Sequence, residues 1–561
     1  MRVRRLLIVG WDGAEPSLVG PMLAQGRLPN LARLREQGAA GRLRTCQPDS
    51  SLAAWTAALT GLGPGRHGLI DFVRRPTGSY RLQLVDARQR LVPTLLAQAA
   101  RAGRRVAALG VPGTWPPEPE PQLSIAGFDS PLATRAAAAA YRPAGLYTAL
   151  ARAGLSWPYG GIDELAVGPG WHLQAERVLH ANLRQKRRLI RWLDGCEPVD
   201  LLWVVFSESD TAAHHFWAFS DPRSPRHRRV PALTDALERI YMALDEALGE
   251  LLAGLAPGGT ALVMSDHGAC GAAAVEVYVN RWLAARGWLR FAEGRRLVAR
   301  LAGGLRDRAG RRLPAVVKQA ILRGRLAGVA LGVDGLARFG GLDLEHSRAF
   351  CDELPQNPGI WIHRRDRDPA GPVAPGPTYE ALRDAITAAL LQWRDPLSGR
   401  AVVARVRRRE EVLSGPAVER APDLMLELAR WDGYRLVAAA SGGRPGPALH
   451  RMAAPAYTAG KGSGTSGAHA AEGILVAAGP QVAAGASLAA ARIEDIGPTA
   501  LRLLGLEPPA GLDGTVLHQL ASQPAAEAAP ALEIEPGTTR SAAGAAGRAA
   551  VRRRLERLGY L

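Results

Sequence analysis

The chain has 561 residues, of which 47% are hydrophobic, and a formal net charge of +18 at pH 7. Its length provides material for a large core and exceeds one minimal domain, whereas no apolar stretch reaches the roughly 18 residues that a membrane span requires. Only three of the 70 basic residues are lysines. The charge therefore reflects arginine spread along the whole chain, and no specific nucleic-acid partner is expected.

The amino-terminal part alternates apolar runs with helical stretches. Residues 6–9 and 106–111 are strand-like, and residues 18–37 and 51–60 are helix-like. Because strands that alternate with helices form parallel βαβ units, the sequence predicts an α/β fold. Residues 1–10 have a basic start but too short an apolar run for a secretory signal, so we expect a first strand in a cytoplasmic protein.

The alternation continues through residues 174–195 (helix), 200–206 (strand), 232–255 (helix) and 261–264 (strand). The segment 284–345 differs, because arginines alternate there with Leu, Val and Ala. This pattern predicts an inserted helical segment. It is either a solvated amphipathic cap or a surface that contacts an anionic membrane or a phosphorylated substrate, so peripheral membrane contact is an open alternative.

The carboxyl-terminal part returns to short apolar runs at residues 359–363, 423–427 and 473–477, and residues 548–561 are typical of a short basic helix. The sequence therefore predicts a core, a basic insert and a tail, which are residues 1–283 with 346–520, residues 284–345, and residues 521–561.

An Asp-His pair ends the apolar run at 261–264. Asp266 and His267 follow a predicted buried strand, and open α/β sheets place their chemistry in the loops at the carboxyl ends of strands. A carboxylate and an imidazole supply the oxygen and nitrogen ligands that a zinc-like ion prefers. Taken alone, such a pair is more often a structural salt link or a capped turn, so a metal site requires further ligands.

Three other segments place similar groups at equivalent positions. Asp12 follows the first strand, and His469 lies in a glycine-rich loop that leads into another strand. Asp210 and His214 are four residues apart, so both reach one ion if a helical turn begins at Asp210. On that geometry His215 points elsewhere.

A fourth segment places Ser50 and Ser51 at the start of a predicted helix, directly after a Pro-Asp turn. A serine at this position is ordinarily an N-cap. A helix amino terminus also stabilises anions, so a serine there is equally well placed to receive a phosphoryl group.

In their order along the chain, these five motifs resemble the alkaline phosphatase superfamily. The similarity is greatest to its branch of type I phosphodiesterases, nucleotide pyrophosphatases and bacterial phosphohydrolase/phosphomutase-type proteins. That branch shows a strand with Asp-Gly, a nucleophile segment ending in Thr-Gly and then Pro-Gly-x-His-Gly, an Asp-x3-His, an Asp-His-Gly and a late Gly-x-His, and the chain has all five. The resemblance covers nearly the whole chain, and it implies a three-layer α/β/α sandwich around a large, mostly parallel sheet.

The resemblance also implies two divalent metal ions, zinc or alternatively manganese, and a serine nucleophile. Counting back from Thr60 and Gly61 places Ser51, not Ser50, at the nucleophile position. One ion would be held by Asp210, His214 and His469, and the other by Asp12, Asp266, His267 and the oxygen of Ser51. Ser51 would then form a covalent phosphoseryl intermediate.

Three positions bear on the substrate. Trp55 replaces the arginine that a sulfatase needs four residues after its nucleophile, so a sulfatase is not expected. Ala54 stands where eukaryotic-type nucleotide pyrophosphatases usually have an asparagine, so their nucleotide preference does not transfer. Lys461, near His469, is either a substrate contact or a solvated loop lysine.

We therefore expect a metal-dependent phosphohydrolase that acts on a small phosphorylated substrate, a phosphate mono- or diester, with the diester modestly favoured. Two alternatives stay open. One is a phosphomutase or phosphotransferase that uses the same two-metal site, and the other is a non-catalytic protein of the same fold that binds a phosphate ligand.

Overall fold

The structure is a computed structural model, and it describes residues 2–80, 82–129, 135–159, 162, 164, 167–292, 341–354, 357–460 and 464–531. Three expectations therefore lie outside the described residues: most of the basic insert (293–340), the basic helix of the tail (548–561) and the substrate contact Lys461. The helical character of the insert and its contact with a membrane or substrate stay predictions. Within the described ranges, no helix has the length and apolarity needed to cross a membrane.

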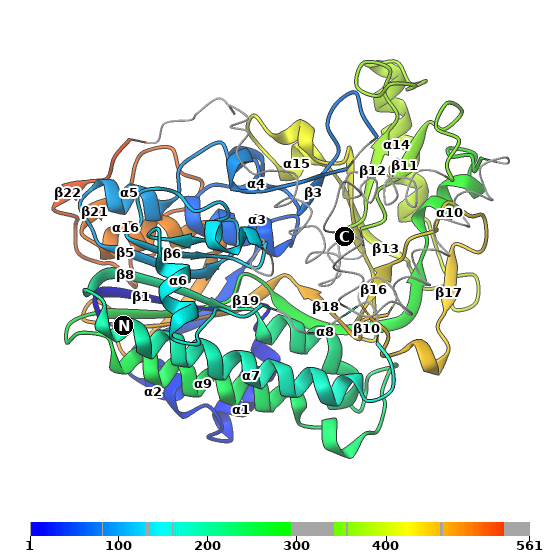
Figure 1. The fold of residues 1–561 in the computed structure, drawn as a ribbon. Helices are drawn as coiled ribbons and strands as arrows, with labels where there is room; N and C mark the ends of the chain where they lie inside the picture. Colours follow the sequence, from blue (N-terminus) through cyan, green and yellow to red (C-terminus); the bar gives the residue numbers. More distant parts are fainter. Residues whose placement is uncertain are drawn as a thin grey trace.

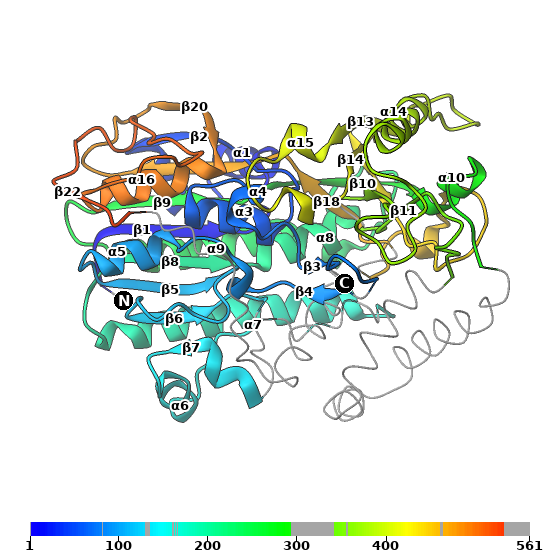
Figure 2. The same ribbon diagram turned by 90° about the horizontal axis from the view of Figure 1, so that it is seen from above.

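A nine-stranded sheet forms the centre of the fold (Figures 1 and 2). Its strands, in spatial order, are β20 (Ser487–Arg492), β2 (Ala39–Arg44), β19 (Glu472–Ala478), β9 (Thr260–Met264), β1 (Val3–Trp11), β8 (Val199–Phe206), β5 (Val106–Val111), β6 (Leu123–Ala126) and β7 (Tyr141–Arg142). β1 is parallel to both of its neighbours, β8 and β9, and the apolar part of β1 is fully buried. Strands buried on both faces are expected to be apolar, as β1 is from Leu6 onward and β8 is from Leu201 onward.

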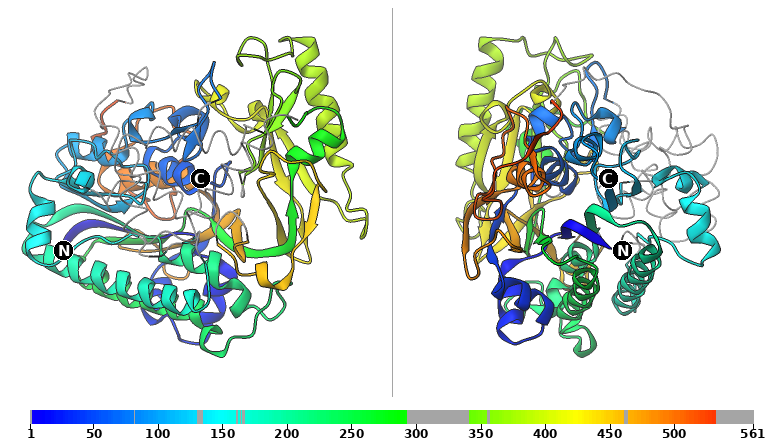
Figure 3. Two further views of the ribbon diagram at one scale, coloured as in Figure 1. Left: turned by 45° about the vertical axis from the view of Figure 1, so that its right-hand side comes forward. Right: turned by 90° about the vertical axis from the view of Figure 1, so that its left-hand side faces the viewer.

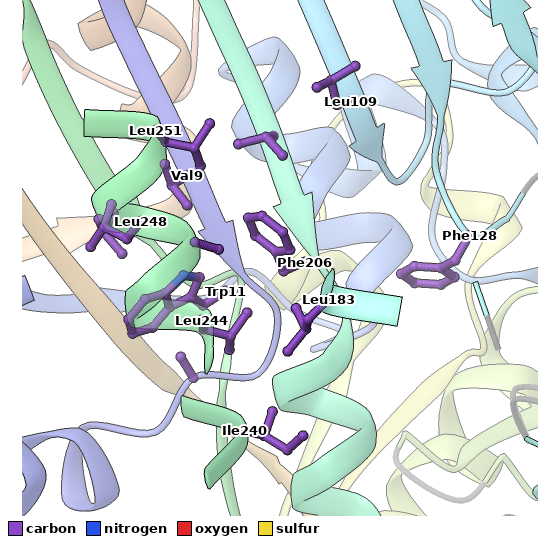
Figure 4. Close-up of a cluster of buried hydrophobic side chains, with 14 of the residues drawn as sticks. Val9, Trp11, Leu109, Phe128, Leu183, Phe206, Ile240, Leu244, Leu248 and Leu251 are labelled. Carbon is purple, nitrogen blue, oxygen red and sulfur yellow. The ribbon is translucent and has the colours of Figure 1, made fainter. Parts of the chain in front are cut away.

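Helices cover both faces of this sheet. One face carries α1 (Pro16–Ala24), α2 (Pro29–Glu36), α7 (Trp171–Trp192), α8 (Glu208–Ser220) and α9 (Ala236–Ala253), and the other carries α3 (Ser51–Thr60), α5 (Leu95–Arg101) and α16 (Ile496–Leu503). Side chains of β1 alternate between the two layers, because successive residues of a strand face opposite sides. Val9 and Trp11 pack with the helical side chains of the first face, as Figure 4 shows, and Ile8 packs into the second. The predicted three-layer α/β/α fold is confirmed.

The long helix expected at residues 18–37 is instead two helices, α1 and α2. The chain breaks between them because Gly26 adopts a left-handed conformation with φ of +69° and Pro29 occupies the first turn of α2. A left-handed glycine ends a helix, and a proline is tolerated only at the beginning of one.

A second body of β-structure lies beside the sheet, drawn in green to yellow in Figure 3. It has its own hydrophobic cluster of residues between Leu82 and Ala438. Its elements are β10 (Gly268–Val277), β15 (Arg430–Trp431), β16 (Tyr434–Ala438), β17 (Leu449–Arg451), β18 (Gly467–Ala470), β11 (Ala349–Cys351), β12 (Gly359–Ile362), β13 (Val403–Arg408), β14 (Leu424–Leu428), α10 (Val279–Ala285) and α14 (Pro377–Leu391). Smaller elements are α4 (Pro64–His67), β3 (Val73–Arg74), β4 (Gln83–Leu84), α6 (Leu146–Arg152), α15 (Arg409–Val412), β21 (Leu506–Glu507) and β22 (Glu527–Ala528).

The two bodies meet at the carboxyl ends of the central strands. Gly10 of β1 lies opposite Val205 of β8 and Met264 of β9, so these three strands end together. The chain passes from β9 into β10, which pairs with β18 in the second body. In an α/β sheet this edge is where ligands bind, and here it is covered by the second body.

Candidate active site

Acidic side chains follow each of the three central strands. Asp12 comes directly after β1, Asp210 lies in the first turn of α8 after β8, and Asp266 comes two residues after β9. All three carboxylates are buried. The fold thus brings together carboxylates that are up to 254 residues apart in the sequence, because parallel strands end at one edge.

Ser51 is the first residue of α3, and it is fully buried. Its Oγ lies 3.1 Å from Nε2 of His267. The neighbouring Ser50 is the N-cap residue, and its Oγ instead donates to Oδ1 of Asp71 at 3.3 Å. The structure therefore places Ser51, and not Ser50, against the Asp-His pair. Backbone N–H groups at the start of a helix lack intrahelical acceptors, so this position also suits a phosphate oxygen.

Three histidines place Nε2 toward the centre of the site and Nδ1 against the backbone. His214, His267 and His469 place Nδ1 at 2.9, 2.9 and 2.8 Å from the backbone carbonyl oxygens of Gly467, Gly268 and Asp49. A carbonyl oxygen only accepts hydrogen bonds, so Nδ1 carries the proton and Nε2 of the neutral ring presents a lone pair. His215, in contrast, bonds through Nε2 to Glu164 at 2.6 Å, away from this group.

The lone pairs on these Nε2 atoms are crowded. Nε2 of His214 and Nε2 of His469 are 3.3 Å apart, and the rings of His267 and His469 stack with centroids 3.8 Å apart. Burial, and then the neighbouring His267, hold the pKa of His469 well below its usual value. Two neutral imidazoles that face each other through lone pairs repel, and a shared cation removes that repulsion.

Carboxylate oxygens complete two groups of ligand atoms, each group lying within 4.8 Å. One group is Asp210, His267 and His469, and the other is Asp12, Asp266 and His267. His214 lies beside the first group, because its Nε2 is 3.2 Å from Oδ1 of Asp210. His267 belongs to both groups by distance, so it stands between two neighbouring clusters of oxygen and nitrogen atoms.

The charges in this cluster are unfavourable without a cation. Burial, followed by repulsion from Asp266 and Asp210, raises the pKa of Asp12 well above its usual value, and burial raises the pKa of Asp266 to about 8. Oδ1 of Asp12 and Oδ2 of Asp266 are buried with no hydrogen-bond partner among the described residues. Buried carboxylate oxygens without partners are costly. Three carboxylates and three imidazoles are a donor set that fits divalent zinc or manganese.

Two contacts around the cluster were missed in the sequence. Nε1 of Trp55 donates to Oδ2 of Asp12 at 3.1 Å, and the signal for it was the position of Trp55 one helical turn after Ser51. Nη1 of Arg435, in β16, donates to Oδ2 of Asp49 at 2.9 Å and to the backbone oxygen of His469 at 3.0 Å. No sequence signal points to Arg435, because its role depends on how the second body packs.

Comparison with known families gives a match over residues 6–451 to the family described as type I phosphodiesterase / nucleotide pyrophosphatase. The chain belongs to this family. Membership confirms the resemblance to the phosphodiesterase branch of the alkaline phosphatase superfamily, and it supports hydrolysis of phosphoesters as the chemistry of the chain. No match was found among curated proteins.

Two solved structures of one bacterial enzyme show the same fold at low sequence identity. Phosphonoacetate hydrolase from Sinorhizobium meliloti 1021, in complex with phosphonoformate, is 16% identical, with a TM-score of 0.52 over 88% of this chain and 94% of that chain. Its complex with phosphonoacetate gives a TM-score of 0.51 with the same identity and coverage. Human ectonucleotide pyrophosphatase / phosphodiesterase 5 is 13% identical, with a TM-score of 0.45 over 90% of this chain and 95% of that chain.

Proposed function

We propose that the chain is a two-metal phosphoric ester hydrolase that cleaves phosphodiesters in preference to monoesters, with Ser51 as the nucleophile. The observation that carries this proposal is the position of Ser51, whose Oγ is 3.1 Å from Nε2 of His267, the residue common to both ligand groups. The preference for diesters is supported by the family to which the chain belongs.

The proposed metal ligands are those expected from the sequence. Asp210, His214 and His469 hold one ion, and Asp12, Asp266, His267 and the Ser51 oxygen hold the other. Two observations support this assignment: one oxygen each of Asp12 and Asp266 has no hydrogen-bond partner among the described residues, and the Nε2 atoms of His214 and His469 face each other. When bound, such ions withdraw charge from a serine oxygen and from phosphoryl oxygens.

The proposed reaction has two steps, transfer of the phosphoryl group to Ser51 and then to water. The Oγ of Ser51 gives up its proton and bonds to phosphorus while the bond from phosphorus to the leaving oxygen breaks, and that oxygen takes up a proton and departs as an alcohol. Water then attacks the phosphoseryl group, which restores the Ser51 hydroxyl and releases the phosphoryl product. The start of α3 stabilises the phosphoryl oxygens through its free backbone N–H groups, and the buried position of Ser51 limits competing water.

The test compares Ser51→Ala with a matched control, Ser50→Ala. The control removes the neighbouring hydroxyl, which donates to Asp71. Both variants and the parent are assayed with bis(4-nitrophenyl) phosphate, 4-nitrophenyl phosphate and a phosphonate ester, with zinc or manganese added. We expect Ser51→Ala to lose at least about 1,000-fold in kcat, in line with the loss of a nucleophile, and Ser50→Ala to stay within about tenfold. Equal rates for Ser51→Ala and the parent would refute the covalent mechanism.

Metal analysis tests the cofactor separately. We expect about two equivalents of zinc or manganese per chain after equilibration and gel filtration, and fewer for Asp266→Asn. Protein that takes up neither metal and has no activity would refute the two-metal site.

A further inference from the structure

A cavity of about 520 Å³ opens between the central sheet and the second body. One wall is the loop before Ser51, including Asp49, together with β2 and β3, and the other comes from β12, β13 and β14. Asp49 lies two residues before Ser51, and its backbone oxygen holds His469. The cavity therefore lies directly beside the proposed catalytic centre.

Eight arginines and six carboxylates line this cavity, so its formal charge is positive. Three of the arginines pair with lining carboxylates: Arg435 with Asp49 at 2.9 Å, Arg42 with Glu472 at 2.8 Å, and Arg405 with Glu427 at 3.9 Å. The other five form no ion pair within the part of the chain that the structure describes, and they are Arg44, Arg74, Arg407, Arg420 and Arg430.

Among these five, Arg74, Arg407 and Arg420 are half-buried, whereas Arg44 and Arg430 are exposed. Nη1 of Arg420 donates to the backbone oxygens of Gly68 at 2.8 Å and Gln89 at 3.1 Å, which fixes the guanidinium without neutralising it. Gly68 has φ of +88°, and a Cβ there would lie 2.8 Å from this nitrogen.

Arg74 reaches only one side-chain acceptor among the described residues, Oε1 of Gln83 at 3.4 Å. Its Nε is buried without a hydrogen-bond partner. Burial lowers the pKa of Arg74 against the opposing attraction of Asp86, and burial followed by the charge of Arg74 lowers the pKa of Arg420. A partly buried cation beside another cation is stabilised by an anion that contacts both.

We propose that Arg74 and Arg420 bind a second anionic group of the substrate, a phosphate or carboxylate that is separate from the phosphate attacked by Ser51. The inference rests on the proposed function, and it specifies the substrate class: phosphoesters that carry a further anion on the group that stays in the cavity. The planar guanidinium suits either anion, because both accept paired hydrogen bonds.

The test uses matched 4-nitrophenyl alkyl phosphates whose alkyl chain ends in a carboxylate, in a phosphonate, or in the uncharged methyl ester of the carboxylate, over a series of chain lengths. We expect kcat/KM for the best-fitting anionic substrate to exceed that of its methyl ester by about tenfold or more, as for a charge-assisted hydrogen bond. The better of the two anionic series identifies the anion.

The ratio of anionic to methyl-ester kcat/KM is then measured in three variants. We expect it to fall toward unity in Arg74→Gln and in Arg420→Gln, and to persist in Arg405→Gln, whose guanidinium already faces Glu427. If Arg420→Gln fails to fold, Arg74→Gln alone decides the test, because the Arg74 side chain makes fewer hydrogen bonds than that of Arg420. A ratio near unity at every chain length in the parent protein, or one that is unchanged in Arg74→Gln, would overturn the inference.

The proposed function and this inference fail in different ways. Absence of turnover with bis(4-nitrophenyl) phosphate contradicts the proposed function, whereas turnover without an advantage for the anionic substrates contradicts the inference alone. Calorimetric titration of Ser51→Ala with the same anionic and methyl-ester compounds measures the arginine pair without turnover. Equal affinities for the charged and uncharged compounds there would also overturn the inference.

Discussion

The indole N–H of Trp55 donates to Oδ2 of Asp12 at 3.1 Å, which joins α3, the helix of the proposed nucleophile Ser51, to the end of β1. Trp55 lies one turn after Ser51, so a single helix carries both the serine and the group that orients the Asp12 carboxylate. Hydrogen bonds of this kind to a metal ligand typically affect metal affinity or activity by about 10- to 100-fold. We predict a loss of that size in kcat/KM for bis(4-nitrophenyl) phosphate in Trp55→Phe.

Trp203 provides the control for this prediction. It is also fully buried against the same face of the sheet, but its Nε1 has no hydrogen-bond partner among the described residues. Trp203→Phe makes the same change in size without removing a bond to Asp12, so its kcat/KM should stay within about threefold of the parent. Equal losses in the two variants would assign the effect to packing.

The pKa of Asp266, raised to about 8 by burial, predicts how the stability of metal-free protein depends on pH. The unfolded chain loses the Asp266 proton near pH 3.8, whereas the folded state keeps it up to about pH 8. The stabilisation that this group gives the folded state is therefore complete below about pH 4 and is lost as the pH rises through about 8. We therefore expect chelator-treated protein to melt at a lower temperature at pH 8 than at pH 6.

Two measurements separate this effect from other titrating groups. Asp266→Asn cannot ionise, so the difference in melting temperature between pH 6 and pH 8 should become smaller in this variant. Added zinc should raise the melting temperature more at pH 8 than at pH 6, because metal binding requires the ionised carboxylates. A parent protein that is more stable at pH 8 without metal would contradict the assignment.

The central layers of the fold could be predicted because their signals are local. Apolar runs such as residues 200–206 are strands buried on both faces, and they give nearly the same pattern in any α/β protein. Several candidate ligands were found for the same reason, since Asp12, Asp266 and His267 follow a strand, and Ser51 and Asp210 lie in the first turn of a helix. The second body could not be predicted, because its short strands pair across long sequence separations, as Gly268 does with Ala470.

The role of Arg435 depends on how the second body packs against the central sheet. Its side chain comes from β16 and donates both to Asp49 and to the backbone of His469, so it positions the loop before Ser51 and the strand that carries a candidate ligand. Burial alone would raise the pKa of Asp49, but Arg435 and the nearby histidines lower it to about 2. The residues around position 435 form no sequence pattern that predicts this role, because only tertiary packing brings Arg435 to Asp49 and His469.

We predict that Arg435→Gln lowers both zinc content and kcat/KM by about 10- to 100-fold, because it releases His469 and leaves the Asp49 carboxylate without its cation. Metal analysis and steady-state kinetics on the same preparation measure the two effects. Arg400→Gln is the control, since Arg400 pairs with Asp432 on the exposed surface of the same body. Full zinc content in Arg435→Gln would show that this contact does not position the ligand.

Lys186 and Glu208 form a buried ion pair under the helix that carries Asp210 and His214. Nζ of Lys186 is 2.7 Å from Oε1 of Glu208, and the Lys186 side chain is fully buried next to the ring of Tyr159. Glu208 is the first residue of α8, where a negative charge also interacts favourably with the helix dipole. The pair therefore fixes the start of α8 against α7, which contains Lys186.

Removing one partner of such a pair costs more than removing both, because it leaves an uncompensated buried charge. We predict that Lys186→Met lowers the free energy of unfolding in urea by about 3–5 kcal/mol. The double variant Lys186→Met/Glu208→Gln should recover part of this loss, because it buries no charge at either position. If the double variant is instead less stable than Lys186→Met, the ion pair is not the source of the effect, and α8 is held mainly by the apolar side chains that pack along it.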